Sequence, residues 1–394
     1  MEWLMNDLIA AADSVYSFIN RTAEKVPEGY RWKTVDYTDH PQYHFNVFNG
    51  VGGIPLFLRD YHLLTGNTRA LELAEGAVAW CISDNPEVCN HQRGVQLGKT
   101  GIASVCLYLD GLSGSGTLHP FCQSNAAHLL SEPVGPITDL LSGEASNGWF
   151  FLKLWERTGA DLYLQGAIRC ARWISEQLIR DELGTYCLVN PDGSWGRVPY
   201  AGLSHGTAGV AHFFALLFQA TGDATWKAVA HELLETLVRH AIPDHGGLNW
   251  SIKLGEKALL RCQHSHGASG IGGVFAKASA ALGESDLLKV AAMAGEAAYQ
   301  YGDFRNNPTL CTGLAGSGEL FVELFKFTGN EMWWDRAKEF ARLAMGYKAS
   351  LPEGDCWPTD TAGLYSADYA YGASGTGHFF LRTLRPLEFE MPLL

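Results

Sequence analysis

Residues 259–275, LLRCQHSHGASGIGGVF, crowd together side chains that bind metals or move protons. Cys262, His264 and His266 are types that zinc accepts as ligands, and Cys311 offers a fourth. Alternate residues share one face only if the segment is extended, and His266 directly precedes a predicted helix. Three interpretations stay open: a metal site, a proton-transfer site, or a glycine turn with histidines beside it.

An aspartate and another histidine stand beside similar glycines, Asp139 in DLLSG and His205 in GLSHG. Histidine titrates near neutrality without perturbation, so His205 is a candidate general acid or base. A carboxylate such as Asp139 would orient and charge-balance the imidazole. The structural alternatives are a histidine bonded to a carbonyl and an aspartate that caps a helix.

These residues belong to a sevenfold repeat built on a G-x-x-G step. A run of about a dozen mostly apolar residues follows most of the steps, as expected of a buried helix. The run stops at another glycine, for example Gly159 or Gly222, where a left-handed helix cap is expected. A more polar amphipathic helix then begins, as in TWKAVAHELLETLVRHA. The first glycines of the seven steps are Gly50, Gly98, Gly143, Gly206, Gly267, Gly313 and Gly372.

Seven helix pairs of this kind predict an all-α fold, a double ring of seven inner and seven outer helices. The last repeat carries no polar capping unit, which favours closure into a toroid over an open solenoid. We predict one domain over residues 1–394, with loops or short hairpins on the glycine-turn side at 184–200 and 244–257. All seven turns would lie at one end of the ring, where helix N-termini favour anions. The residues beside the first glycines are Asn49, Leu97, Ser142, His205, His266, Thr312 and Tyr371.

Composition narrows the class of protein. The formal charge of -13 leaves no basic excess for a phosphate backbone, which disfavours nucleic-acid binding. Nine cysteines in 394 residues suit a reducing cytoplasm better than a disulfide framework. No stretch of about 18 apolar residues predicts a membrane span, and the N-terminal segment reads as an amphipathic helix.

Taken together, GLSHGTAG, SHGASGIGG and CTGLAGSGE resemble the lanthionine synthetase C-like (LanC-like) cyclases, with similarity from about Asn46 to Leu384. The resemblance implies the same double ring of helices. It also implies addition of a peptide cysteine thiol to dehydroalanine or dehydrobutyrine, which gives an enolate that must be protonated. The family pattern places catalytic residues at Asp139, His205 and Arg261.

The resemblance fails at the family's zinc ligands. The family shows W-C-x-G in the fifth turn and C-H-G in the sixth, where this chain has His264-Ser265-His266-Gly267 and Cys311-Thr312-Gly313. One of three ligands remains, and a hydroxyl is a poor substitute for a thiolate at zinc. Cyclase domains of class III lanthipeptide synthetases look similar without these ligands. We therefore expect no cofactor, and zinc only through a rebuilt site.

The leading hypothesis is a zinc-independent peptide cyclase. Its substrate pocket would contain His264, Ser265, His266, Cys311, Thr312 and Tyr371. No kinase signature is present, so dehydration of the precursor peptide would fall to partner enzymes of the kinase and lyase type.

Two alternatives remain. One is a non-catalytic scaffold that binds the peptide and the dehydrating enzymes. The other is a carbohydrate enzyme with the same toroid, which would need a pair of carboxylates. The candidate carboxylates are Asp139 and Glu144, then Asp360 and Asp368.

Overall fold

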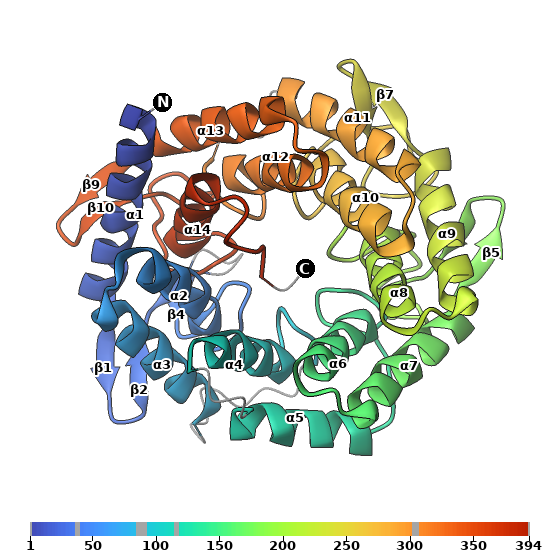
Figure 1. Cartoon of the computed structure of the whole chain (residues 1–394), viewed down its shortest axis with the longest axis horizontal. Helices are drawn as coiled ribbons and strands as arrows, with labels where there is room; N and C mark the ends of the chain where they lie inside the picture. Colours follow the sequence, from blue (N-terminus) through green and yellow to red (C-terminus); the bar gives the residue numbers. More distant parts are fainter. Residues whose placement is uncertain (1, 36–39, 84–92, 114–117, 302–306, 393–394) are drawn as a thin grey trace.

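The computed structural model describes residues 2–35, 40–83, 93–113, 118–301 and 307–392, and these form two concentric rings of helices (Figure 1). Helices alternate between the rings along the chain, and each inner helix packs on an outer one. The predicted all-α double ring is confirmed. The inner helices are α2 (Ile54–Thr65), α4 (Lys99–Ser113), α6 (Glu144–Thr158), α8 (Thr207–Thr221), α10 (Ala268–Leu282), α12 (Leu314–Thr328) and α14 (Ala373–Leu384). The outer helices are α1 (Glu2–Thr22), α3 (Thr68–Ile82), α5 (Pro120–Ser131), α7 (Asp161–Glu176), α9 (Ala224–Arg239), α11 (Asp286–Gln300) and α13 (Glu331–Met345).

Both glycines of the G-x-x-G step are required by close backbone packing. A Cβ on the first glycine would crowd its own loop; on Gly143 it would lie 2.5 Å from the backbone nitrogen of Asp139. A Cβ on the second glycine, such as Gly209 or Gly270, would overlap a carbonyl oxygen of the loop before the helix. The step therefore lets the first turn of each inner helix lie against the loop that leads into it.

Inner helices end and outer helices begin with standard caps. Gly159, Gly222 and Gly329 take left-handed φ angles of 65–67° directly after the inner helices. Asp223 and Asn330 then cap the outer helices, each accepting from a backbone N–H two residues on. The predicted helix ends are confirmed at these positions.

The N-terminal helix closes the ring. Helix α1 packs along α14, so the seventh inner helix takes its outer partner from the opposite end of the sequence (Figure 1). Leu8, Val15 and Ile19 are fully buried in this contact region, and Gly377 lets Val15 approach α14 closely. Closure replaces the polar capping unit that an open array of helix pairs would need.

Short two-stranded hairpins follow four of the outer helices and lie at the rim of the molecule (Figure 1). They are β1 and β2 (Glu24–Val26, Gly29–Arg31), β5 and β6 (Ile179–Asp181, Gly184–Tyr186), β7 and β8 (Ile242–Asp244, Gly247–Asn249), and β9 and β10 (Ala349–Leu351, Gly354–Cys356). A fifth small sheet pairs β3 (Thr34–Val35) with β4 (Pro41–Gln42). Two hairpins fall near the predicted 184–200 and 244–257 but begin earlier, because the turns sit at 181–184 and 244–247 directly after the outer helices.

Three buried tryptophans anchor these hairpins to the outer ring. Trp32, Trp250 and Trp357 each donate Nε1–H to a carbonyl near the end of the preceding outer helix, at 2.7–2.8 Å. Each is no more than 1% exposed. These tryptophans are structural, so they do not supply the sugar-binding platforms that a carbohydrate enzyme would need.

The C-terminal tail after α14 runs into the middle of the ring (Figure 1). Arg382 holds the tail through its Nε–H, which donates to the carbonyl of Phe389 at 3.2 Å. Lys326 pairs with Glu390 at 2.6 Å. Among the described residues, no helix has the length and apolar character needed to cross a bilayer.

Candidate functional site

Three residues before each first glycine form three levels of the inner ring. We name them by distance from the glycine: mouth position (nearest), ring position and floor position (farthest). The mouth positions are Asn49, Leu97, Ser142, His205, His266, Thr312 and Tyr371. The ring positions are Phe48, Gln96, Leu141, Ser204, Ser265, Cys311 and Ala370, and the floor positions are Val47, Val95, Leu140, Leu203, His264, Leu310 and Tyr369.

Backbone hydrogen bonds join the ring positions of neighbouring turns. The N–H of Gln96 donates to Leu141, that of Leu141 to Ser204, and that of Cys311 to Ala370, at 2.9–3.1 Å. Among the described residues, no such bond joins Ser265 to the turns on either side. Gly267 also has a φ of 102°, whereas Gly206 has -138°. The fifth turn is therefore the irregular member of the ring.

Asp139 and His205 form a hydrogen-bonded pair at this end of the molecule. Oδ2 of Asp139 lies 2.7 Å from Nδ1 of His205. Oδ1 accepts from the backbone N–H of Ser142 at 2.8 Å, within the loop that leads into helix α6. Asp139 is 1% exposed, whereas the His205 side chain is 24% exposed. The carboxylate is thus fixed by the fold, and the imidazole it orients remains accessible.

Aromatic side chains surround His205. Its ring centroid lies 5.9 Å from that of Trp195, 6.3 Å from Tyr200 and 6.5 Å from His266. Trp195 is 55% exposed although it is large and apolar. Trp195 and Tyr200 were missed by the sequence analysis; the available signal was two aromatic residues in the turn-rich insert just before the His205 turn.

His266 is held as a neutral imidazole beside His205. Burial, with the neighbouring His205 and Arg261, lowers the pKa of His266 to about 4. Its Nδ1 is buried without a hydrogen-bond partner in the described part of the chain. His266 can therefore accept a hydrogen bond but carries no charge at neutral pH.

Arg261 lies close enough to influence His266 but is exposed. Its Nη1 lies 3.4 Å from Oε1 of Gln263, and the Arg261 carbonyl accepts from Asn249 at 3.3 Å. The structure records no direct contact between the Arg261 guanidinium and the Asp139–His205 pair within the residues described. The backbone of Arg261 is held by Asn249, while its side chain is exposed and contacts only its near neighbour Gln263 among the described residues.

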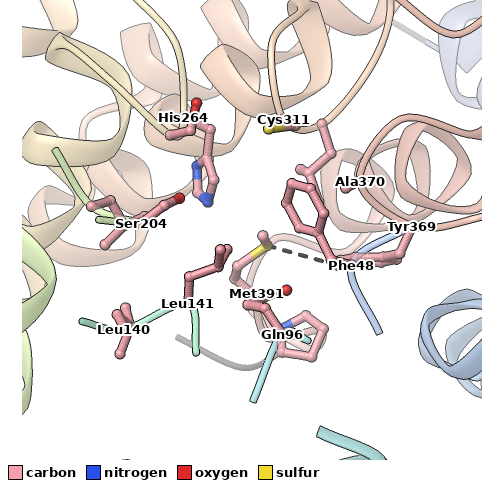
Figure 2. Close-up of a pocket in the computed structure, with 14 residues that line it drawn as sticks. Phe48, Gln96, Leu140, Leu141, Ser204, His264, Cys311, Tyr369, Ala370 and Met391 are labelled. Carbon is pink, nitrogen blue, oxygen red and sulfur yellow. Dashed lines mark hydrogen bonds between the residues drawn. The ribbon is translucent and has the colours of Figure 1, made fainter. Parts of the chain in front are cut away.

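A cavity lies beneath the ring positions, and the tail closes it from the other side (Figure 2). Its free volume is about 40 Å³, which suits one small side chain. All seven ring positions line it, with the floor residues Leu140, Leu203, His264, Leu310 and Tyr369 and the tail residues Met391 and Pro392. Asp139, His205 and Arg261 are not among its walls; His205 occupies a mouth position, and Asp139 is bonded to it.

Of the six predicted pocket residues, His264, Ser265 and Cys311 line this cavity. The other three, His266, Thr312 and Tyr371, occupy mouth positions instead. Thr312 is bonded to Thr309 at 3.1 Å and lies 3.4 Å from Asp360. The Tyr371 ring meets Phe48 edge-on at 5.3 Å. The six residues thus separate into a cavity group and a mouth group.

The residues at the family's zinc positions do not fit zinc. Ser265 and Thr312 offer hydroxyls, and burial raises the pKa of the Cys311 thiol to about 11, so it stays protonated. Within the described residues, no three His, Cys, Asp or Glu side chains are grouped as metal ligands, and this includes Cys262, His264 and His266. The side chains at these positions offer hydrogen-bonding hydroxyl and thiol groups in place of metal ligands.

The carboxylates needed by a carbohydrate enzyme are not paired. Glu144 is turned toward Arg93, at 3.2 Å, and accepts from the backbone of Gly135 at 3.0 Å. Asp368 is fully buried and bonded to Ser366 and to the backbone N–H of Tyr371. Asp139 is therefore a single carboxylate bonded to a histidine.

Comparison with known proteins places this geometry in context. Residues 41–394 match the family described as "Lanthionine synthetase C-like protein". A relative from Danio rerio, "Glutathione S-transferase LANCL1", is 24% identical over 50% of this chain and 46% of its own length. "LanC-like protein GCL1" from Arabidopsis thaliana is 30% identical over 36% of this chain and 31% of its own. The chain thus aligns with less than half the length of these curated relatives.

Among solved structures, nisin cyclase superposes with a TM-score of 0.70 at 14% identity, covering 98% of this chain and 94% of that one. A cellobiose 2-epimerase from Spirochaeta thermophila gives a TM-score of 0.53 at 13% identity, covering 98% and 96% of the two chains. A GH76 α-mannanase from Bacteroides thetaiotaomicron gives 0.52 at 11% identity, covering 96% and 95%. At these identities the likeness concerns the fold alone.

Proposed function

The chain belongs to the lanthionine synthetase C-like family, and on that premise we propose that it closes thioether rings in a dehydrated peptide without zinc. The observation that carries the proposal is the 2.7 Å bond between Asp139 Oδ2 and His205 Nδ1; Ser204, the residue before His205, lines the central cavity. A carboxylate that accepts from Nδ1–H leaves Nε2 as the working nitrogen of the imidazole. Such a nitrogen moves protons to and from a bound substrate.

The proposed reaction adds a cysteine thiol of the peptide to the β-carbon of dehydroalanine or dehydrobutyrine. The S–H bond breaks, a C–S bond forms, and the double-bond electrons move toward the neighbouring carbonyl to give an enolate. Protonation of the α-carbon completes the step. His205 shuttles the proton, Asp139 holds the tautomer, and Arg261 offers its exposed guanidinium to the enolate oxygen.

Cys311, the cysteine of the protein that lines the cavity, is unsuited to act as the nucleophile. The raised pKa of Cys311 keeps its thiol protonated at neutral pH. A substrate thiol that enters from water has a pKa of about 8.5 and already supplies a few per cent of thiolate. Cys311 and Ser265 therefore serve as walls that position the incoming groups.

The test uses a synthetic peptide with one cysteine and one dehydroalanine. Ring closure is followed by the loss of alkylatable thiol in mass spectrometry. We expect the wild type to accelerate closure and His205→Ala to slow it by about 100-fold or more while peptide binding is retained. Chelator-treated wild type should keep its rate. Equal closure by His205→Ala and wild type would exclude the assignment.

Two alternatives have distinct outcomes in the same experiment. Because one relative is named a glutathione S-transferase, a parallel reaction offers free glutathione to a dehydroalanine peptide that lacks cysteine. Faster addition of glutathione than ring closure would assign the site to intermolecular thiol transfer. Peptide binding with no acceleration of either reaction would favour a scaffold that gathers the peptide and its dehydrating enzymes.

A further inference from the structure

His264 introduces a polar, titratable group into an otherwise apolar level of the ring. Five of the seven floor positions are Val or Leu. His264 lines the central cavity and also a smaller one beneath it. Figure 2 shows its imidazole directed into the central cavity, on the side where Ser204 and Cys311 form the wall. The residue that follows it, Ser265, is the one at which the ring of backbone bonds is interrupted.

The imidazole of His264 is uncommitted. Neither of its ring nitrogens has a hydrogen-bond partner among the residues described. The other polar floor residue, Tyr369, is engaged: its phenol lies 2.8 Å from Nδ1 of His378, whose Nε2 lies 2.9 Å from Asp60. Of the two polar floor groups, only His264 is therefore free to interact with a ligand.

The surroundings keep His264 neutral in the empty cavity. Burial is the main cause and the positive charges of Lys277 and Arg382 add to it, so that the pKa of His264 falls to about 4. A neutral imidazole has a free lone pair that can accept a hydrogen bond from a thiol, but a pKa of about 4 alone makes it a weak base. A thiolate formed beside it would oppose the burial effect, because an anion stabilises the imidazolium.

From these observations we propose that His264 is the base that removes the proton from the substrate thiol inside the cavity, while His205 supplies the proton to the α-carbon. The inference rests on the proposed function and divides its proton transfers between two histidines. The substrate class it implies is a peptide whose cysteine side chain enters the cavity while its backbone remains at the mouth. A cavity of about 40 Å³ has room for such a side chain.

The S–H proton passes to a ring nitrogen of His264, and the sulfur lone pair forms the C–S bond with the β-carbon. The π electrons of the double bond move onto the amide carbonyl as an enolate. His205, protonated beside Asp139, then gives the α-carbon its proton. Water returns one proton to His205 and removes one from His264, so no oxidant or cofactor is consumed.

The first test measures the thiol itself and needs no turnover. A peptide with alanine in place of dehydroalanine binds but cannot react, and its thiolate is followed by absorbance near 240 nm as pH is raised. Because burial opposes ionisation of a thiol here, as it does for Cys311, we compare the wild type with His264→Asn and expect the pKa of the bound thiol to be at least about one unit lower in the wild type. His264→Asn should also slow ring closure by about 100-fold.

His212→Asn is the matched control. His212 is 2% exposed, both of its ring nitrogens lack partners, and burial lowers its pKa to about 3. It shares the smaller cavity with His264 but does not line the central one. His212→Asn should therefore keep the wild-type thiol pKa and closure rate, although the cost in folding is similar.

The outcomes separate the two proposals. If the wild type closes the ring and His264→Asn keeps the wild-type closure rate and thiol pKa, the role of His264 is overturned and the proposed function stands. Equal losses in His264→Asn and His212→Asn also overturn it, because the effect is then structural. If the thiol pKa is lower in the wild type than in His264→Asn but the wild type closes no ring, the role of His264 as a thiol base is supported and the proposed cyclisation is contradicted. A peptide that does not bind the wild type overturns both.

Discussion

Asp139 performs two tasks, one with each carboxylate oxygen. Oδ1 accepts from the backbone N–H of Ser142, and the same loop bond recurs when Asn46 accepts from Asn49 and Asp368 from Tyr371. This loop bond is thus a property of several turns of the repeat. The bond from Oδ2 to His205 is additional to it. The two oxygens therefore separate the structural contact of Asp139 from the role that we propose for it.

Asp139→Asn tests that division at the scale of the residue. An amide oxygen can still accept from Ser142, so we expect the melting temperature to change little. The charge beside His205 is lost and the amide no longer selects its tautomer, so ring closure should fall by about 100-fold or more. Thermal unfolding and the closure rate, measured on the same preparation, check both statements.

Asp368→Asn is the control at the equivalent position of the seventh turn, where no histidine is bonded. Burial raises the pKa of Asp368 from 3.8 to about 6. A raised folded-state pKa contributes stability below pH 3.8 that is lost as the pH rises through about 6. At pH 7.5 the amide therefore removes an unfavourable buried charge, and both activity and stability should be retained. Equal loss of activity in the two variants would mean that Asp139 acts only through its bond to the loop backbone.

At the scale of the element, the glycine turn couples helix packing to the site. In six of the seven turns the second glycine lies against the carbonyl oxygen of its floor residue, so the inner helix determines where that residue sits; the third turn has Ser146 there. Gly270 contacts His264 in this way, Gly316 contacts Leu310 and Gly375 contacts Tyr369. The cavity wall is positioned by helix starts more than by its own side-chain contacts.

Two glycines of helix α10 allow a matched test of this coupling. A Cβ on Gly270 would overlap the carbonyl oxygen of His264, whereas one on Gly273 meets nothing within 4 Å. We expect Gly270→Ala to lower the free energy of unfolding by roughly 2–3 kcal/mol. Gly273→Ala should raise it by roughly 0.5–1 kcal/mol, because alanine favours helix. Urea denaturation measures both, and similar values for the two variants would contradict the packing described.

The features of the fold that could be predicted from the sequence are those determined by residues close together in the chain. Each G-x-x-G step has a steric reason that lies within one turn, so the inner helices and their glycine caps could be located from spacing alone. The amphipathic pattern of residues 1–20 predicted a helix but did not identify its partner. That α1 pairs with α14 follows from ring closure, which no local pattern encodes.

The cavity was predicted only in part for a related reason. His264, Ser265 and Cys311 were among the predicted pocket residues, but most of the ring and floor positions that line the cavity were not. Which level faces the cavity depends on the direction of the loop backbone before each inner helix. The approach of Trp195 to His205 depends on how a loop returns over the mouth. Sequence periodicity contains neither piece of information.

At the scale of the whole molecule, closure distinguishes this ring from an open array. In an open array each helix pair contacts only its neighbours, so damage at one end stays local. Here α1 joins the two ends of the chain, and residues as far apart as Val15 and Gly377 are in contact. We infer that the ring unfolds as one cooperative unit.

Val15→Ala tests this cooperativity. Val15 lies on α1 and is fully buried against α14. Loss of its two methyl groups should lower the free energy of unfolding by roughly 1–3 kcal/mol. If the ring is one unit, the slowest-exchanging amides of α8, on the far side of the ring from α14 (Figure 1), should lose the same free energy of protection as those of α14. Native-state hydrogen exchange measures both helices in one experiment. Loss of protection confined to α1, α13 and α14 would show that the molecule opens at the closure and behaves as an array of neighbouring pairs.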